Sequence, residues 1–359
     1  MKKVFVIAEV GVNHDGDLQK AIDLVSVASE SGADAVKFQS FNSSELATYN
    51  APKAEYQKRF EKKDNNQLEM LRKLELSYED QIKIFQECTK KNIEFMSTAF
   101  DQESLSFLID DLGVKKLKIA SGEITNAPFL ISHGKSNLEI ILSTGMSNIE
   151  EIDQALKFLC FGNIKTNDIP KDKKINEVYA SDQSQNYLKE KVSLLHCTTQ
   201  YPAKDENLNL NAINTLKENF NLRVGYSDHS KGILASSNAV SLGAEIIEKH
   251  FTLDKNASGP DHSSSLEPDE LKDMISNIRR TENFLGDGIK KAIQDEFENL
   301  IVARKSIYAK KSIKIGDKFS DENISIKRPG SGLSPIRYWD LLGKVSRNNY
   351  LIDEEIKNE

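Results

Sequence analysis

Residues 223–251 read RVGYSDHSKGILASSNAVSLGAEIIEKHF, in which two short apolar runs rich in β-branched residues flank a spacer long enough for one helix. Six further runs of the same kind precede this unit: VFVIAEV (4–10), AVKFQSF (35–41), EFMSTAF (94–100), KLKIASGE (116–123), EIILSTG (139–145) and VSLLHCT (192–198). The spacers between them are helix-sized. A strand–helix unit repeated eight times predicts a parallel (β/α)₈ barrel.

Nearly every one of these runs ends in polar or charged residues that a plain core strand would not contain. In (β/α)₈ barrels the functional groups lie at the carboxyl ends of the strands, where the βα loops form one face. The sequence therefore predicts a rim of ligand-binding side chains. Its members are Glu9, Lys37, Gln39, Ser97, Thr98, Lys118, Ser121, Glu123, Ser143, Thr198, Ser227, His229 and His250.

The chain of 359 residues is longer than a barrel of about 250 residues, so we expect a second unit. The helical pattern over 268–285 completes the barrel, which gives a catalytic domain at 1–285 and a linker at 286–300. Residues 301–359 contain short alternating runs, SIYAKKSI and NISIKRPG among them, and predict a small, mostly β domain.

Two spacers are unusually long. The stretch 42–80 is too long for a plain βα loop, and we interpret it as a lid or substrate wall. The stretch 161–191 is polar and without periodicity, and it precedes a strand on the face opposite the rim. We interpret it as a solvated excursion without a catalytic role.

Composition points to a cytoplasmic protein that does not span a membrane. The chain is 38% hydrophobic and 29% charged. No run approaches the ~18 apolar residues of a membrane span. The N-terminal MKKVFVIAEVG is broken by Glu9 and is better interpreted as a strand than as a signal peptide. Three cysteines, Cys88, Cys160 and Cys197, lack CxxC spacing, which disfavours a disulfide framework or a zinc site.

Charge is distributed unevenly along the chain. The net charge is −7, yet residues 301–350 hold eleven Lys and Arg against four Asp and Glu. A basic tail on an acidic body can indicate nucleic-acid binding, but no aromatic-rich binding motif accompanies these lysines. A small basic domain that docks on an acidic one is the preferred interpretation, and no nucleic-acid partner is expected.

Two lysines on the predicted rim indicate an anion site. Lys37 and Lys118 come from the second and fourth runs, and short hydroxyl side chains accompany them. Cations and hydroxyl groups that converge on one barrel mouth suit a phosphate or a carboxylate. Taken singly, either lysine is equally well explained by a salt bridge.

Two histidines on the rim indicate a metal site. His229 and His250 end the seventh and eighth runs, which are neighbours in a barrel, so both imidazoles can reach one ion. Two imidazoles with open positions for water and substrate suit Mn²⁺, and Zn²⁺ less well. A structural hydrogen-bonding role is the alternative for each histidine alone. His14, in GVNHDGD, is either a turn residue or a ligand.

Glu9 and Glu123 end the first and fourth runs and are expected to face the same cavity. Either carboxylate can activate water, orient a sugar hydroxyl or move a proton. A salt-bridge partner for the lysines is the alternative role. Together with the anion and metal sites, the two carboxylates suit condensation of a phosphorylated three-carbon donor with an aldehyde.

The segments that carry these residues resemble a known family, the bacterial sialic acid synthases, whose members also make legionaminic and pseudaminic acids. The resemblance rests on IAEVGVNHDGD, ADAVKFQSF, APKAEYQK, QLEMLRKLELS, STAFD, KIASGEITN, ILSTGM, LLHCTTQYPA, VGYSDHS, IEKHFTLDKNASGPDH and KRPGSGLSP. It implies that the enzyme condenses phosphoenolpyruvate with N-acetylmannosamine to N-acetylneuraminate, with C–O cleavage and release of phosphate. The alternative substrate is 2,4-diacetamido-2,4,6-trideoxymannose, which would make the product N,N'-diacetyllegionaminate.

The same resemblance implies a role for individual residues. Lys37, Lys118, Glu9 and Glu123 correspond to the catalytic and phosphoenolpyruvate-binding positions, and His229 and His250 to ligands of a divalent metal, Mn²⁺ foremost and otherwise Mg²⁺ or Co²⁺. Substrate contacts fall on Thr98, Ser121, Ser143, Tyr201, Ser227, Asp261 and Arg328.

The tail resembles the antifreeze-like (SAF) domain. In this family that domain swaps across a homodimer, which implies that Arg328 reaches the active site of the neighbouring subunit.

Two other functions are alternatives. A Schiff-base aldolase would use Lys118 or Lys37 as the nucleophile and would keep its activity without metal. A non-enzymatic carbohydrate-binding protein, led by its antifreeze-like tail, would not need two lysines, two histidines and two carboxylates on one rim.

Overall fold

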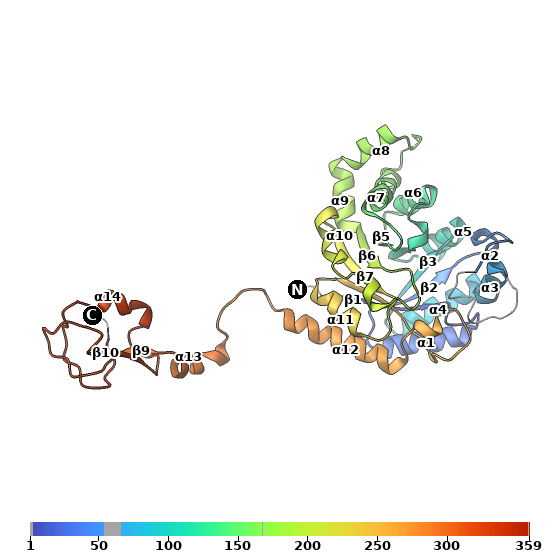
Figure 1. The fold of residues 1–359 in the computed structure, drawn as a ribbon. Helices are drawn as coiled ribbons and strands as arrows, with labels where there is room; N and C mark the ends of the chain where they lie inside the picture. The colour runs from blue at the N-terminus through green and yellow to red at the C-terminus, as the bar shows by residue number, and fades with distance from the viewer. Residues whose placement is uncertain (1–2, 54–65, 167, 358) are drawn as a thin grey trace. The chain divides into compact units, whose positions relative to one another are not determined.

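The computed structural model describes residues 3–53, 66–166, 168–357 and 359 (Figure 1). The contacts within it divide the chain into two compact units, residues 1–287 and 288–359. The sequence placed the end of the first unit at residue 285.

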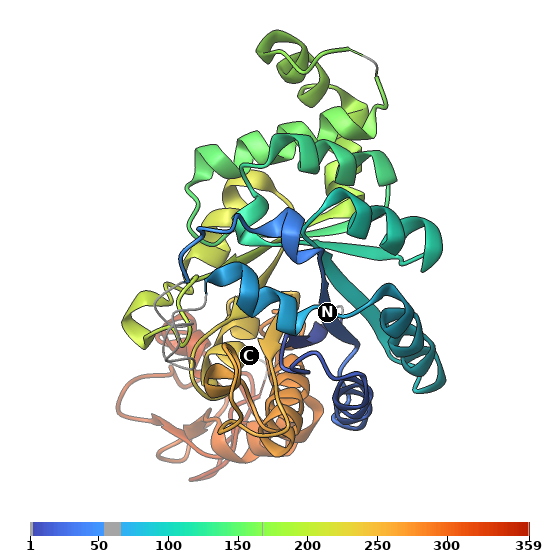
Figure 2. The same cartoon turned by 90° about the vertical axis from the view of Figure 1, so that its right-hand side faces the viewer.

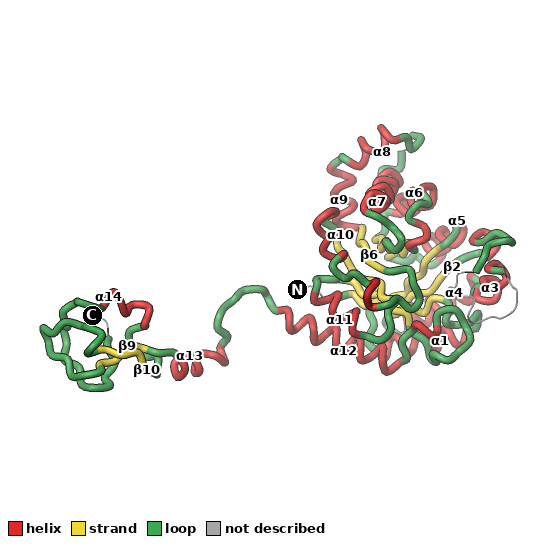
Figure 3. The backbone as a smooth tube through the Cα atoms, viewed as in Figure 1, coloured by secondary structure: helices red, strands yellow, loops and turns green. Residues whose placement is uncertain are grey.

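The first unit is a closed barrel of eight parallel strands, β1 to β8, each paired with its neighbours in chain order and β8 paired with β1. The predicted fold is confirmed. Figure 3 shows these strands surrounded by helices. The strands are β1 (Phe5–Gly11), β2 (Ala35–Ser40), β3 (Glu94–Ala99), β4 (Lys116–Ile119), β5 (Glu139–Ser143), β6 (Val192–Cys197), β7 (Arg223–Asp228) and β8 (Ile246–His250).

The helices of this unit pack outside the strands, as the view in Figure 2 also shows. Most begin at an Asn, Asp or Ser whose side chain accepts a hydrogen bond from the first turn, for example Asn148 before α7. They are α1 (Leu18–Glu30), α2 (Ser43–Leu46), α3 (Gln67–Leu74), α4 (Tyr78–Lys90), α5 (Gln102–Ser106), α6 (Ala127–Ser136), α7 (Ile149–Asn163), α8 (Asp172–Tyr179), α9 (Asp182–Lys191), α10 (Ala212–Phe220), α11 (Leu234–Ser241) and α12 (Pro268–Leu285).

Strand alternation separates two apolar layers. Inward-facing residues form a small cluster inside the barrel, made of Ile7, Ala35, Met96, Ile141, Leu195 and Ile246. Outward-facing residues such as Phe95 and Ala99 of β3 belong to the large core under the helices. Because successive side chains point to opposite faces, Thr98 lies on the inner side with Met96. The apolar layer inside the barrel thus forms the floor below the polar rim.

The stretch 161–191 differs from the sequence-based interpretation. After α7 it forms α8 and α9, and Ile175, Val178, Tyr187 and Leu188 are buried in the main core. Figures 1 and 2 place α8 at the outer edge of this unit, beyond α7. Each helix is at most ten residues long and buries only a few side chains, so the apolar period was too short to stand out.

The stretch 42–80 contributes two helices near the rim. In α3 the residues Met70, Leu71 and Leu74 pack with Val12 and Phe41 in a separate apolar cluster. Residues 54–65, which include most of the APKAEYQK motif, lie outside the described part of the chain.

The small unit has its own core. Strands β9 (Ser306–Ala309) and β10 (Ile324–Lys327) pair antiparallel, and isolated bridges such as Ile313 with Tyr350 extend the pairing. Helix α14 (Tyr338–Leu341) packs Leu341 into the same core. The predicted linker 286–300 is helical at its end, because α13 spans Phe297–Ala303. In the described residues of both units, none of the helices has the length and apolar character needed to cross a bilayer.

Candidate active site

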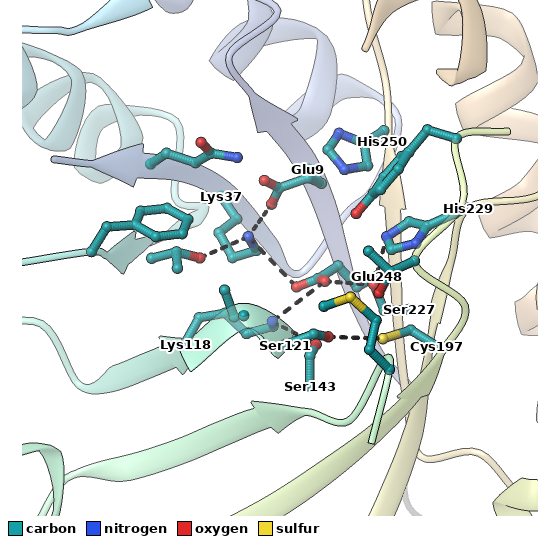
Figure 4. Close-up of a pocket in the computed structure, with 18 of the residues that line it drawn as sticks. Glu9, Lys37, Lys118, Ser121, Ser143, Cys197, Ser227, His229, Glu248 and His250 are labelled. Atoms are coloured by element: carbon teal, nitrogen blue, oxygen red, sulfur yellow. Dashed lines mark hydrogen bonds and ion pairs between the residues drawn. The ribbon is translucent and has the colours of Figure 1, made fainter. Parts of the chain in front are cut away.

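A cavity of about 320 Å³ opens at the carboxyl ends of the barrel strands (Figure 4). Ten residues predicted as site residues line it: Glu9, Lys37, Thr98, Lys118, Ser121, Ser143, Tyr201, Ser227, His229 and His250. The structure brings them together because each lies on the inner face of a strand, above the apolar layer, or in the loop that follows a strand.

Lys37 lies among acceptors that come from three strands. Its Nζ is 2.5 Å from Glu9 Oε2, 3.1 Å from Thr98 Oγ1 and 3.7 Å from Oε2 of Glu248. The Lys37 side chain is only 4% exposed and that of Glu9 3%. Charges that are buried this deeply are tolerated because they are paired.

Lys118, on β4, is the second lysine of the cavity. Its Nζ donates to Ser143 Oγ at 2.6 Å and lies 3.8 Å from Oε1 of Glu248. That carboxylate also accepts a hydrogen bond from Ser227 Oγ at 2.8 Å. Glu248 therefore lies between the two lysines, with one oxygen near each, as Figure 4 shows.

Burial and pairing set different protonation states for the two carboxyls. Burial alone would raise the pKa of Glu248, but Lys118 and Lys37 outweigh it and lower the pKa to about 2. Burial dominates at Glu9 and raises its pKa to about 8, although Lys37 opposes the shift. For Lys37, burial disfavours the charge, yet Glu248 and Glu9 together raise its pKa. Glu248 is therefore the fixed anion of the site and Glu9 the carboxyl that can exchange a proton.

The two histidines face one another across the ends of β7 and β8. Their ring centroids are 5.8 Å apart, and the Tyr201 ring is 4.2 Å from that of His229. His229 Nδ1 is 2.7 Å from the carbonyl oxygen of Thr198 and must donate its proton to it, so Nε2 is left as the electron-pair donor. Burial lowers the pKa of His229 to about 4, which keeps the ring neutral.

These features fit a metal ligated by two imidazoles. His250 Nδ1 is buried and has no hydrogen-bond partner among the described residues. Within the same residues no three His, Cys, Asp or Glu side chains converge as a complete ligand set. Two neutral imidazoles beside an open cavity leave the remaining positions of an ion to water and substrate.

A second group of hydroxyls borders the lysines. Ser121 Oγ accepts a hydrogen bond from the Gly145 N–H at 3.0 Å and lies 3.2 Å from Cys197 Sγ.

A Cβ atom at Gly145 would come within 2.3 Å of Thr199 Oγ1 and 2.9 Å of Ser121 Oγ. Glycine is therefore required where the β5 loop passes the cavity.

Three predicted site residues are not among those that line the cavity. Glu123 lies in the short 3₁₀ turn Ser121–Glu123, and its carboxylate accepts a hydrogen bond from the Asn126 side chain at 2.7 Å. The turn follows β4 and Glu123 is absent from the lining of the cavity, contrary to the expectation that it faces the cavity. Asp261 is buried in the loop after β8, and Arg328 belongs to the small unit.

Two further rim predictions are corrected or resolved. Ser97 bonds Ser40 Oγ at 2.7 Å on the outer side of the strands, because it alternates with Thr98. His14 is a turn residue, since its Nδ1 accepts the Gly16 N–H at 3.0 Å.

Glu248 is the functional candidate that the sequence interpretation missed. The signal was present in EIIEKHF, because Glu248 and His250 are two residues apart and therefore share the inner face of β8. Gln39, Cys197 and Thr199 also line the cavity, together with Leu46, Leu71, Phe100 and Met146.

A closed parallel barrel with a buried charged cavity, followed by a small unit with its own core, defines a TIM-barrel enzyme with an appended domain. The NeuB family model matches residues 24–290, and the SAF domain model matches residues 304–357. The chain belongs to the NeuB family of sialic acid synthases and their relatives, as its motifs predicted.

Among its relatives, N,N'-diacetyllegionaminic acid synthase of Campylobacter jejuni is 48% identical over 99% of this chain and 100% of its own length. The enzyme of that name from Legionella pneumophila is 43% identical over 96% of this chain and 91% of its own. A crystal structure of N-acetylneuraminic acid synthetase from Leptospira borgpetersenii, in complex with citrate, superposes with a TM-score of 0.67 at 34% identity, and covers 83% of this chain and 90% of that one.

Proposed function

We propose that the protein condenses phosphoenolpyruvate with 2,4-diacetamido-2,4,6-trideoxymannose to form N,N'-diacetyllegionaminate and phosphate. The observation that carries the reaction type is the cavity itself, in which two buried lysines and two facing histidines share about 320 Å³. The choice of sugar rests on the two relatives at 48% and 43% identity, which support the legionaminate alternative better than N-acetylneuraminate.

The apolar part of the cavity lining also suits the less polar sugar. Leu46, Leu71, Phe100 and Met146 contribute apolar surface to its lining. A sugar with a methyl group at C6 buries one more apolar carbon there than N-acetylmannosamine, which carries a hydroxymethyl group at that position. Burial of a methyl or methylene group is worth about 0.8 kcal/mol, and a hydroxyl left without a partner costs more.

The chain's own residues account for the binding of the donor. Lys37 and Lys118 hold the carboxylate and phosphate of phosphoenolpyruvate as charges, with Thr98, Ser121, Ser143 and Ser227 as hydroxyl donors. Glu248 stays ionised and stabilises the positive charge that develops at C2 when C3 of the donor attacks the aldehyde carbon. Neither lysine forms a covalent bond to the substrate.

Glu9 moves the proton that the reaction must transfer. Formation of the C–C bond leaves the former aldehyde oxygen as an alkoxide, to which Glu9 gives its proton. Water then adds at C2, and Glu9 takes the proton that the water loses. Collapse of the tetrahedral centre forms the C2 ketone and breaks the C2–O bond to phosphate, and the proton of the C2 hydroxyl leaves with the phosphate. A carboxyl whose pKa is about 8 is suited to both steps near neutral pH.

His229 and His250 would hold a divalent ion, Mn²⁺ in the first place, and a bound ion would supply polarisation of the aldehyde oxygen. His229 offers Nε2 as its electron-pair donor, because Thr198 occupies Nδ1. Tyr201 packs against the His229 ring and limits its rotation.

The remaining parts of the proposal concern assembly and location. The small unit is proposed to exchange between two copies of the chain and to bring Arg328 to the sugar of the other copy, as the SAF resemblance implies. The reaction is proposed to occur in the cytoplasm, with which three free, buried cysteines are compatible.

The decisive assay measures phosphate release from phosphoenolpyruvate with each of the two sugars in the presence of Mn²⁺. We expect the diacetamido sugar to give the higher kcat/KM, and donor with ¹⁸O in the bridging position to release labelled phosphate. Turnover with N-acetylmannosamine alone would restore the N-acetylneuraminate assignment. A lysine adduct trapped by borohydride would place the protein among the aldolases.

A further inference from the structure

A buried ion pair lies directly behind the two histidines, on the outer side of the same strands. Lys249 Nζ is 3.1 Å from Asp228 Oδ2, and both side chains are 0% exposed. Asp228 and Lys249 are paired in the β7–β8 register. They alternate with the inward residues Ser227, Glu248 and His250, so they face the helices instead of the cavity.

The pair holds the backbone on both sides of His229. Asp228 Oδ1 accepts the Ser230 N–H at 2.8 Å and the Ser230 hydroxyl at 2.6 Å, and Oδ2 accepts the Ser236 hydroxyl of α11 at 2.7 Å. Lys249 Nζ donates to the Ser230 carbonyl oxygen at 2.5 Å. The network thus ties the residue that precedes His250 to the two residues that flank His229.

The network also reaches the loop that carries Tyr201. The Ala203 N–H donates to the His229 carbonyl oxygen at 2.8 Å, and Ala203 bridges to Ser230. The loop that supplies the Thr198 acceptor for His229 Nδ1 is therefore linked to the same segment. Displacement of Ser230 would therefore shift the Thr198 carbonyl and the Tyr201 ring, which both contact the His229 ring.

Stability alone does not explain charged residues at this position. The outward positions one step earlier on the same strands are apolar, for example Ile247, and belong to the main core. A fully buried ion pair is often no more stabilising than apolar residues of similar size, because both charges lose their hydration. Among the described residues of β7 and β8, the outward-facing charges of Asp228 and Lys249 lie at the same level of the barrel as the two histidines.

We propose that Asp228 and Lys249 are positioning residues that fix the relative placement of His229 and His250 and thereby set the affinity of the site for a divalent ion. The inference rests on the metal site of the proposed function. Neither residue contacts the cavity, so both act through the histidines. Partners that orient metal ligands typically change metal affinity by about 10–100-fold when removed.

The test uses Lys249→Met and the neutral double variant Lys249→Met/Asp228→Asn, in which asparagine keeps an acceptor for Ser230. Binding of Mn²⁺ is measured from the electron paramagnetic resonance signal of the free ion. We expect affinity to fall at least about tenfold in both variants. The affinity for phosphoenolpyruvate should stay within about threefold, because Lys37 and Lys118 lie on other strands.

A metal-free readout separates this inference from the proposed function. In ¹⁵N-histidine NMR of the metal-free protein, the Nδ1–H signal of His229, bonded to Thr198, should shift or broaden in both variants. If the wild-type protein binds no Mn²⁺, the metal part of the proposed function fails, and this signal alone decides the positioning role.

Lys116→Met is the matched control. It removes a lysine that pairs with Glu94 on the adjacent strand at 2.9 Å, at the opposite end of the same barrel. We expect it to leave Mn²⁺ affinity and the His229 signal unchanged. Wild-type affinity and an unchanged signal in the folded double variant would overturn the proposal. Failure of both Lys249 variants to fold would also overturn it, since the pair would then be structural.

Discussion

The two ends of the barrel use the same residue types in different surroundings. At the amino ends of the strands, Lys116 pairs with Glu94 at 2.9 Å and Arg279 with Asp34 at 2.7 Å, and all four side chains are between 17% and 25% exposed. At the carboxyl ends, Lys37, Glu9, Lys118 and Glu248 are at most 7% exposed. The apolar layer around Met96 separates the two ends.

This difference in exposure decides what the charges do. Ion pairs that water reaches contribute about 0–1 kcal/mol each, so those at the amino ends act as modest links between neighbouring segments. Charges at the carboxyl ends have lost their hydration and depend on one another, so the removal of one leaves another unpaired. Because burial of these charges costs free energy, such a cluster is expected at a catalytic or binding site. Substitutions at the two ends should therefore differ in their effect on activity.

The largest effect is expected from the histidines. His229→Ala or His250→Ala should lower kcat by about three orders of magnitude, because Lewis-acid polarisation of a carbonyl is worth several kcal/mol. Steady-state turnover with saturating phosphoenolpyruvate and Mn²⁺ measures it, and circular dichroism checks the fold. Full activity in EDTA-treated protein from which the metal has been removed would contradict the metal role of both residues.

The lysines should affect the donor next most strongly. Lys37→Met or Lys118→Met should raise the KM for phosphoenolpyruvate by about 30–150-fold, which corresponds to the loss of a charged hydrogen bond worth on the order of 2–3 kcal/mol. Initial rates over a range of donor concentrations measure the change. An unchanged KM in a folded variant would mean that the lysine serves only to balance Glu9 and Glu248.

The swapped small domain can be tested by complementation. If Arg328 acts on the other copy, a dimer of an Arg328→Ala chain with a Lys118→Met chain has one intact site and one site with both defects. Equal mixing should then restore about a quarter of wild-type activity, because half of the dimers are mixed. Native mass spectrometry confirms the exchange of subunits. No recovery after exchange would show that each chain completes its own site.

Asp261 should reveal the cost of a buried carboxylate near the rim. Burial raises its pKa from 3.8 to about 6, so the folded protein prefers the protonated form, and stability is lost as pH rises from about 4 through 6. Asp261→Asn should therefore be more stable than wild type by about 3 kcal/mol at pH 8 and nearly equal to it at pH 4. Urea unfolding at the two pH values measures this. A variant less stable at pH 8 would indicate that the carboxylate makes a favourable contact.

The smallest effect is expected at the amino ends. Lys116→Met should change stability by less than about 1 kcal/mol and leave kcat and both KM values unchanged, because the pair is partly exposed. Thermal unfolding and the standard assay measure both. A loss of activity comparable to that of Lys118→Met would remove the distinction between the two ends of the barrel.

The sequence predicted most of the site because strand ends are visible in it. His229 and His250 end apolar runs and Lys37 and Lys118 lie within them, and parallel strands in a barrel bring such side chains together. Glu123 also follows an apolar run, but a short turn after β4 directs it elsewhere. The geometry of that turn depends on local hydrogen bonds, which cannot be predicted from the spacing of apolar residues.

The alternation of inward and outward side chains along each strand can be read from the sequence, but the predicted rim did not follow it at every position. Ser97 was expected at the rim although Thr98 occupies the inner face, and Glu248 was missed although it shares that face with His250. Helices α8 and α9 were missed for a different reason. Each buries only a few side chains. Their helical structure therefore depends more on tertiary packing against α7 than on the periodicity of their own apolar residues.

The sequence by itself determined the barrel, its order of strands and most of the side chains that its mouth presents, since periods of 2 and 3.6 residues are written in the order of apolar residues. Only the tertiary structure decided which charges pair and which protons they hold. Glu9 and Glu248 are both glutamates that face the same lysines, yet their pKa values are about 8 and about 2. Both are buried, but Glu248 lies near both lysines and accepts a hydrogen bond from Ser227, whereas the charge of Glu248 raises the pKa of Glu9. These placements exist only after the chain has folded.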